Sequence, residues 1–376
     1  MSTLSSVTYH LVRRGLDAAD EMPSNPNQPD RPFPVLGFTV VALTAVLMSI
    51  VCFCIDYTFG KVVATLAAIE DPNPDVYVRI DADANAPKPD DEENDPEVPV
   101  PQQKPITSSL RATIAHLRAR AGRWSLFRGL RMYMLTAMAT KLVVSPLSAV
   151  WGSNLVGHAI ARFVAEILVA NLTVAWVHIV ISEPSTKRFY QRIPGRKTWI
   201  NIIPVAALRS LASQVTMFIP LVIGYSTKVI KNGGAVNPVV PSDELPPIKV
   251  VGGSLGIAAL SLVLYLLIDM PAQVIFIRVA ASMLPEEDET IVPFDRSFGG
   301  KVTPQIVGGA GKIGIVDAWR SFDWASRVRF VKLVGKVFLM VFVVGLLFGL
   351  VLILQAYFLL GDAIDKAFSS MQPVTH

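Results

Sequence analysis

The residues that could do chemistry in this chain are charged side chains inside long apolar segments. Lys141 and Arg209 each lie near the middle of such a segment, and neither has a residue of opposite charge within four positions. Because a charge inside a bilayer is costly, it is a candidate functional group. If both side chains face a central cavity, they would attract a small anion such as a carboxylate or phosphate. The alternative is that both extend to a membrane interface.

A second group of charges has the spacing of a local ion pair. Arg162 and Glu166 are four residues apart, which places them on one face of a helix. We expect them to pair within the membrane, and a structural role explains such a pair better than a binding role does. The apolar segments hold five further polar side chains, namely Asn171, His178, Gln214, Lys336 and Gln355.

The elements that must position these residues are membrane-spanning helices. The chain has 376 residues, of which 52% are hydrophobic and 17% are charged, whereas soluble domains carry about 25% charge. Six apolar segments reach the ~20 residues that a helix needs to cross a bilayer. We therefore predict an all-α membrane protein with six transmembrane helices, at about 35–68, 130–150, 155–182, 200–225, 251–284 and 331–360.

The basic residues support this arrangement. With six spans, alternate loops lie on one face of the membrane, and these hold 21 of the 34 Lys and Arg residues, against 7 on the other face. Such a bias is typical of multi-pass proteins, so the sequence pI of about 9.0 does not indicate a nucleic-acid partner. The lipid bilayer is the expected partner.

Between the spans the sequence changes character. Residues 70–106 are rich in proline and contain the acidic run 90–97, so we predict a disordered loop, with solvation or docking of a protein partner as its alternative roles. Arginine-rich residues 107–133 and residues 315–329 predict amphipathic surface helices, the first capped by Ser109. Residues 1–33 and 363–376 are predicted polar tails without a signal peptide.

The sequence predicts no enzyme, cofactor or metal site. It contains no Walker A, HExxH or strand-linked GxGxxG motif. Cys52 and Cys54 are two residues apart in an apolar run, where they face different ways and have no further ligands nearby.

An internal repeat organises the spans. At an offset of 217, residues 42–66 and 259–284 share apolar positions, and Lys61 then corresponds to Arg278. This arrangement resembles the mitochondrial carrier family. The resemblance implies three repeats of two spans each, at 34–150, 151–230 and 231–362, and a multi-pass location in a mitochondrial membrane, inner or outer.

In carriers, odd-numbered helices end in proline, followed by an acid two positions on, a base at plus five and often arginine at plus seven. Acid and base from neighbouring repeats then form an ion-pair gate. The gate-like positions in this chain are Cys54, Asp56, Phe59 and Lys61; Pro184, Thr186, Phe189 and Gln191; and Pro271, Gln273, Phe276 and Arg278. Phenylalanine replaces the base in all three copies, so either three aromatic rings at one depth would close the pathway by packing, or no gate operates at all.

Two functions follow from the resemblance. The first is a solute carrier for a small anion, with Lys141 and Arg209 in its cavity and Phe59, Phe189 and Phe276 near its closed end. The second is a carrier-derived protein that no longer transports and serves as an outer-membrane scaffold, fusion factor or insertase. The lost ion-pair motif and the long acidic loop favour the second.

Overall fold

The structure is a computed structural model that describes residues 35–71, 105–152, 154–231, 240–241, 246–302, 308–309 and 311–371. The statements below concern these residues. The acidic run 90–97, most of the loop 70–106 and the tail 1–33 lie outside them.

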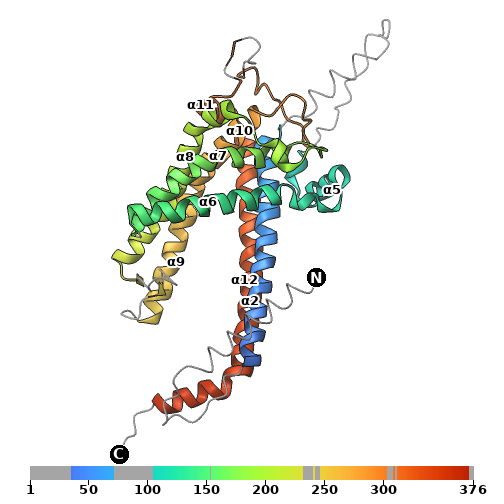
Figure 1. Ribbon diagram of the computed structural model, residues 1–376. Helices are drawn as coiled ribbons and strands as arrows, with labels where there is room; N and C mark the ends of the chain where they lie inside the picture. The colour runs from blue at the N-terminus through green and yellow to red at the C-terminus, as the bar shows by residue number, and fades with distance from the viewer. Residues whose placement is uncertain are drawn as a thin grey trace, which may run out of the picture. The chain divides into compact units, whose positions relative to one another are not determined.

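The described residues form a helical membrane protein (Figure 1). Six helical stretches are long and apolar enough to cross a bilayer: Thr39–Ile69, Arg123–Trp151, Leu155–Ile181, Arg196–Ser226, Ile248–Ser282 and Trp324–Gln355. We call them spans 1 to 6. A single antiparallel ladder joins β1 (Ile230–Lys231) to β2 (Val240–Pro241). The prediction of an all-helical protein with six membrane helices is therefore confirmed.

Two of the spans are built from several helical pieces. Span 1 consists of α2 (Val35–Ile55), the π-helical η1 (Asp56–Val63) and α3 (Ala64–Ile69). Span 5 consists of α9 (Pro247–Leu264), the π-helical η5 (Tyr265–Asp269) and α10 (Met270–Ser282). The other spans are centred on α6 (Leu130–Trp151), α7 (Leu155–Ile181), α8 (Arg196–Ser226) and α12 (Trp324–Met371).

Short helices occupy the connections between spans. They are the 3-10 helices η2 (Ile106–Ser108) and η4 (Phe189–Arg192), and the α-helices α5 (Leu110–Ala121) and α11 (Ile315–Arg320). The 3-10 helix η3 (Arg123–Phe127) forms the beginning of span 2. Gly129 separates η3 from α6 with a φ of +69°, a left-handed conformation that glycine adopts without strain. Asn154 starts α7, since its side-chain oxygen accepts a hydrogen bond of 2.7 Å from the Gly157 amide.

Two local expectations were wrong. Residues 315–329 do not form one helix, because the chain breaks at Ser321–Asp323 and the Asp323 carboxylate accepts a hydrogen bond from the Ser326 amide at the start of α12. Ser109 precedes α5 without a side-chain capping bond; instead the Thr113 hydroxyl donates to the Ser109 carbonyl at 2.8 Å. Helix α12 continues to Met371.

The contacts divide the chain into two units. The smaller unit holds residues 35–51 and 343–371, and within it the Gln355 amide donates to the Thr44 hydroxyl at 2.9 Å, a polar contact between α2 and α12. The larger unit, residues 52–342, holds the rest of the six spans and is the part described below.

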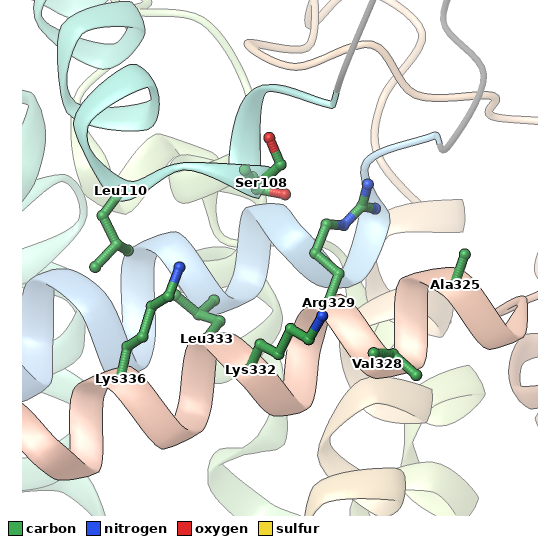
Figure 2. A pocket seen from close by; sticks show the side chains of 9 residues that line it. Ser108, Leu110, Ala325, Val328, Arg329, Lys332, Leu333 and Lys336 are labelled. Carbon is green, nitrogen blue, oxygen red and sulfur yellow. The ribbon is translucent and has the colours of Figure 1, made fainter.

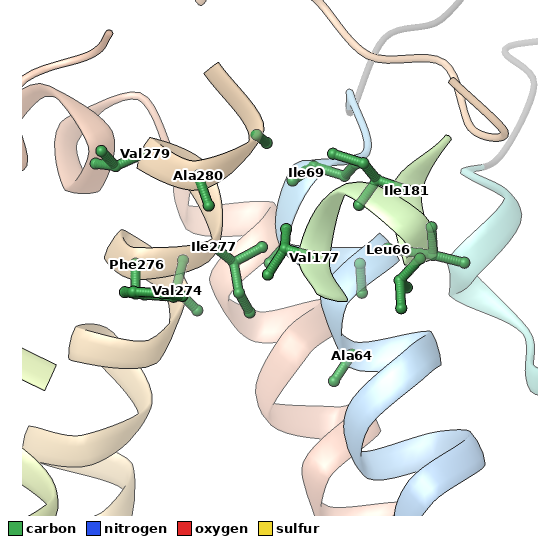
Figure 3. Packing of buried hydrophobic residues seen from close by; sticks show 14 of the residues in the cluster. Ala64, Leu66, Ile69, Val177, Ile181, Val274, Phe276, Ile277, Val279 and Ala280 are labelled. Atoms are coloured by element: carbon green, nitrogen blue, oxygen red, sulfur yellow. The ribbon is translucent and has the colours of Figure 1, made fainter. Parts of the chain in front are cut away.

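The core of the larger unit lies where spans 1, 3 and 5 end. The last turns of α3, α7 and α10 pack on one another, and each of them is continuously buried, over 62–70, 174–178 and 274–281. Figure 3 shows Leu66 and Ile69 beside Val177 and Ile181, and Ile277 on the α10 side of the cluster. Small residues such as Ala67 and Ala280 let the helices approach closely, as is usual in membrane bundles.

Candidate functional site

Arg209 is the centre of a cluster of charged residues inside the spans. It lies on α8, and its guanidinium carbon is 4.6 Å from the centre of the Phe276 ring on α10. Glu166, Asp269 and Arg162 are the charges that act on it. The cluster therefore joins spans 3, 4 and 5 at a depth where water is scarce and each charge is expensive.

The nearest complete ion pair belongs to α7 alone. The Nε of Arg162 lies 3.0 Å from Glu166 Oε1, one helical turn away, and the Glu166 side chain is the more buried of the two. This is the pair that the four-residue spacing predicts. Because Arg162 occupies Glu166, that carboxylate does not neutralise Arg209 by direct contact.

Asp269 ends the π-helical segment η5 and is 6% exposed. The Gln273 side-chain amide donates to its Oδ2 at 2.6 Å, whereas Oδ1 is buried and has no hydrogen-bond partner among the described residues. A π-segment inserts an extra residue in a helix and is frequent at functional sites.

The π-helical segment of span 1 also carries an aspartate. Asp56 begins η1 and is exposed, and its charge acts on Tyr265 of η5, as does that of Asp269. A Cβ at Gly60 would lie 2.8 Å from Asp56 Oδ1, so glycine at this position lets the carboxylate lie against its own helix. Lys61 of the same segment acts electrostatically on Asp269.

Several polar atoms of this region are buried without a partner among the described residues. The most informative are Arg209 Nε and Gln214 Nε2 on α8, both donors, and Asp269 Oδ1, an acceptor. A buried polar atom without a partner costs about 1–3 kcal/mol. Donors and an acceptor of this kind are the groups with which a site would hold a polar ligand.

The two cations that the sequence pairs lie on different helices. Lys141 is exposed on α6, whereas Arg209 lies on α8 against the ring of Phe276. Sequence reasoning missed Asp269, although its signal was present: it is a charged residue within the apolar segment 251–284 and precedes Pro271. The same rule that selects Lys141 and Arg209 would have selected it.

The three phenylalanines of the gate-like positions are not equivalent. Phe276 is almost fully buried, and Phe59 packs partly buried against the same core. Phe189 is 37% exposed on η4, where its ring meets that of Tyr190. It lies outside the span because α7 ends at Ile181 and the chain leaves the helix there.

Arg278 joins the end of span 5 to the end of span 1. Its side chain is almost fully buried and donates to the Ala68 carbonyl at 2.8 Å and to the Ser321 hydroxyl at 3.0 Å. The guanidinium also lies over the rings of Phe298 and Phe322, at 4.7 and 5.4 Å. Pro271 lies in the first turn of α10, which continues directly from η5.

A connecting segment, residues 285–294, closes over these helix ends. The Ile291 amide donates to the Ile181 carbonyl at 2.9 Å, and the Asp71 amide donates to the Pro293 carbonyl at 3.1 Å. Outside the spans, Glu287 raises the pKa of the Lys187 ammonium by pairing with it. We call this segment, with the last turns of spans 1, 3 and 5, the sealed end.

A pocket of about 260 Å³ lies beside the beginning of span 6. Figure 2 shows Arg329, Lys332 and Lys336 of α12 around it, opposite Ser108 and Leu110. Lys332 and Lys336 are exposed and make no ion pair within the described residues. A basic pocket at the end of a membrane helix has the chemistry that attracts anionic headgroups.

Comparison of the chain with protein-family models, with curated proteins and with solved structures finds no significant match.

Proposed function

We propose that this protein is a multi-pass carrier of a small polar solute, organised like a mitochondrial carrier and located in a mitochondrial membrane. The observation that carries the proposal is the buried cluster around Arg209. Arg209 Nε and Asp269 Oδ1 are both buried, and neither has a hydrogen-bond partner among the described residues. Charged residues of this kind mark solute pathways in membrane proteins.

The sealed end supports the same proposal. A carrier that exposes its binding site to one side at a time needs one closed end, and here the last turns of spans 1, 3 and 5 pack on one another and are largely buried. Arg278 and segment 285–294 hold those turns together by hydrogen bonds rather than by acid–base pairs. This is consistent with the replacement of the carrier acid and base by Gln273 and Phe276.

Transport by reconstituted protein tests the proposal. The purified chain is placed in liposomes, and uptake of labelled carboxylates, phosphates and amino-carboxylates is compared with that of empty liposomes. We expect saturable uptake of at least one compound, abolished in Arg209→Ala. Arg118→Ala is the matched control, because Arg118 is an exposed arginine on α5, outside the spans. Uptake that is equal in Arg209→Ala and wild type contradicts the proposal.

A second candidate function is a carrier-derived insertase or scaffold. Two observations favour it: Asp56 and Lys141 are charged side chains exposed at the depth of the spans. Such groups could receive the polar end of a segment that enters the bilayer from the side. Insertion of a tail-anchored reporter into liposomes that contain wild type or Asp56→Ala tests this candidate; equal insertion with and without the protein rules it out.

A further inference from the structure

The charges around Arg209 are balanced, and this restricts what the site can hold. Arg162 and Glu166 neutralise each other at 3.0 Å, which leaves the guanidinium of Arg209 and the carboxylate of Asp269. An anion alone would be attracted by Arg209 and repelled by Asp269. A solute that carries both signs would be attracted at both ends.

Arg209 and Asp269 are nevertheless held as separate groups. They lie on α8 and η5, which pack together, and their charges act on each other. No ion pair within 4.0 Å joins them, although each keeps one polar atom without a partner among the described residues. A structural role alone would be better served by direct contact, since that would satisfy both atoms.

Two residues of α10 keep the pair apart. Gln273 donates to Asp269 Oδ2 and leaves Oδ1 free, while the ring of Phe276 lies under the guanidinium of Arg209. These are the positions at which the carrier pattern has its gate acid and gate base. Here they position the carboxylate and the guanidinium of two neighbouring elements instead of forming a gate.

We propose that the solute is a small zwitterion, with its carboxylate on Arg209 and its ammonium on Asp269. The Arg209 Nε–H donates to the carboxylate, and the ammonium donates to Asp269 Oδ1. The inference rests on the proposed transport function and names its substrate class. Gln273 and Phe276 act as positioning residues that keep donor and acceptor available.

Two sets of three related compounds test this inference. In the first set, 4-aminobutyrate carries both charges, butyrate only the negative one and butylamine only the positive one. In the second set, alanine, propionate and ethylamine repeat the comparison with the two charges on neighbouring carbons. Binding to the purified full chain is measured by titration calorimetry, and uptake of the two acids by reconstituted transport. In wild type we expect at least one zwitterion to bind about tenfold or more tightly than its matched acid and amine, since each lost charged hydrogen bond removes at least that factor.

Two variants then test which residue binds the ammonium end of the solute. Asp269→Asn keeps the shape of the side chain and should remove most of the preference for the zwitterion over the acid, while Gln273→Leu should reduce it. The comparison of zwitterion, acid and amine on the wild-type protein needs no variant, so it tests the inference even if a variant does not fold. If the acids bind as tightly as the zwitterions, the inference is wrong and the proposed transport function stands. If no solute of the wider panel is taken up, both are wrong.

Discussion

Removal of the Arg278 side chain should destabilise the larger unit strongly. Arg278→Ala leaves the Ala68 carbonyl and the Ser321 hydroxyl without their donor, at about 1–3 kcal/mol for each buried group. It also removes two cation–π contacts, each worth about 0.5–2 kcal/mol. Relief from burying a charge without a carboxylate partner within 4.0 Å offsets part of this loss. We expect a net decrease of about 2–4 kcal/mol in the free energy of unfolding.

The assay is reversible unfolding of the detergent-solubilised protein, followed by tryptophan fluorescence. Arg278→Lys keeps the charge but loses the two-armed guanidinium, so its effect should lie between those of wild type and Arg278→Ala. Arg118→Ala, on the exposed face of α5, should change stability by less than about 0.5 kcal/mol.

A double-mutant cycle isolates the contact itself. Arg278→Ala and Ser321→Ala should couple by about 0.5–3 kcal/mol, because their side chains share a hydrogen bond. If Arg278→Ala unfolds like wild type, or if the two changes are additive, Arg278 does not hold the sealed end and the reasoning is refuted.

Three further predictions concern single side chains and the basic pocket. Tyr57→Phe removes a hydroxyl that donates to the Arg128 carbonyl at 2.5 Å and accepts from the Trp176 indole at 3.2 Å. The free energy of unfolding should decrease by about 1–3 kcal/mol. A change smaller than the error of a chemical-unfolding curve would contradict this. Gly60→Ala places a Cβ 2.8 Å from Asp56 Oδ1. Because the exposed Asp56 side chain can rotate away, we expect a small loss of stability and a larger loss of uptake, both measured on the same preparation. Unchanged uptake would show that the position of the Asp56 carboxylate does not matter for transport. Phosphatidylglycerol should stabilise the protein more than phosphatidylcholine does, and the double variant Lys332→Ala/Lys336→Ala should reduce this difference by roughly 1 kcal/mol per lysine. If the variant and wild type respond equally to the two lipids, no anionic headgroup binds in the pocket.

The spans could be predicted from the sequence because length and hydropathy decide them. The prediction for span 3, 155–182, ends within one residue of helix α7, Leu155–Ile181. The start of span 6 was less predictable: apolar content begins near residue 331, whereas the helix begins at Trp324, where Asp323 supplies a local cap. Hydropathy measures burial in lipid and does not register such caps.

The arrangement of the site could be predicted only in part. The spacing of Arg162 and Glu166 was sufficient, because one helix fixes both residues. The contact of Arg209 with Phe276 depends on how α8 packs against α10, which no local pattern encodes. The π-segment η5 shifts the side chains that come after its first turn, so a regular helix also misplaces Asp269 at its end.

The central claim is that Arg209 holds a solute inside the spans, and uptake by liposomes tests it most directly. Wild type, Arg209→Ala and Arg118→Ala are reconstituted at equal protein content, and uptake of labelled 4-aminobutyrate, alanine, butyrate, propionate and inorganic phosphate is followed over time. The account predicts saturable uptake of at least one compound by wild type and Arg118→Ala, and uptake at the empty-liposome level by Arg209→Ala. Uptake of no compound by wild type, or equal uptake by all three proteins, would contradict it.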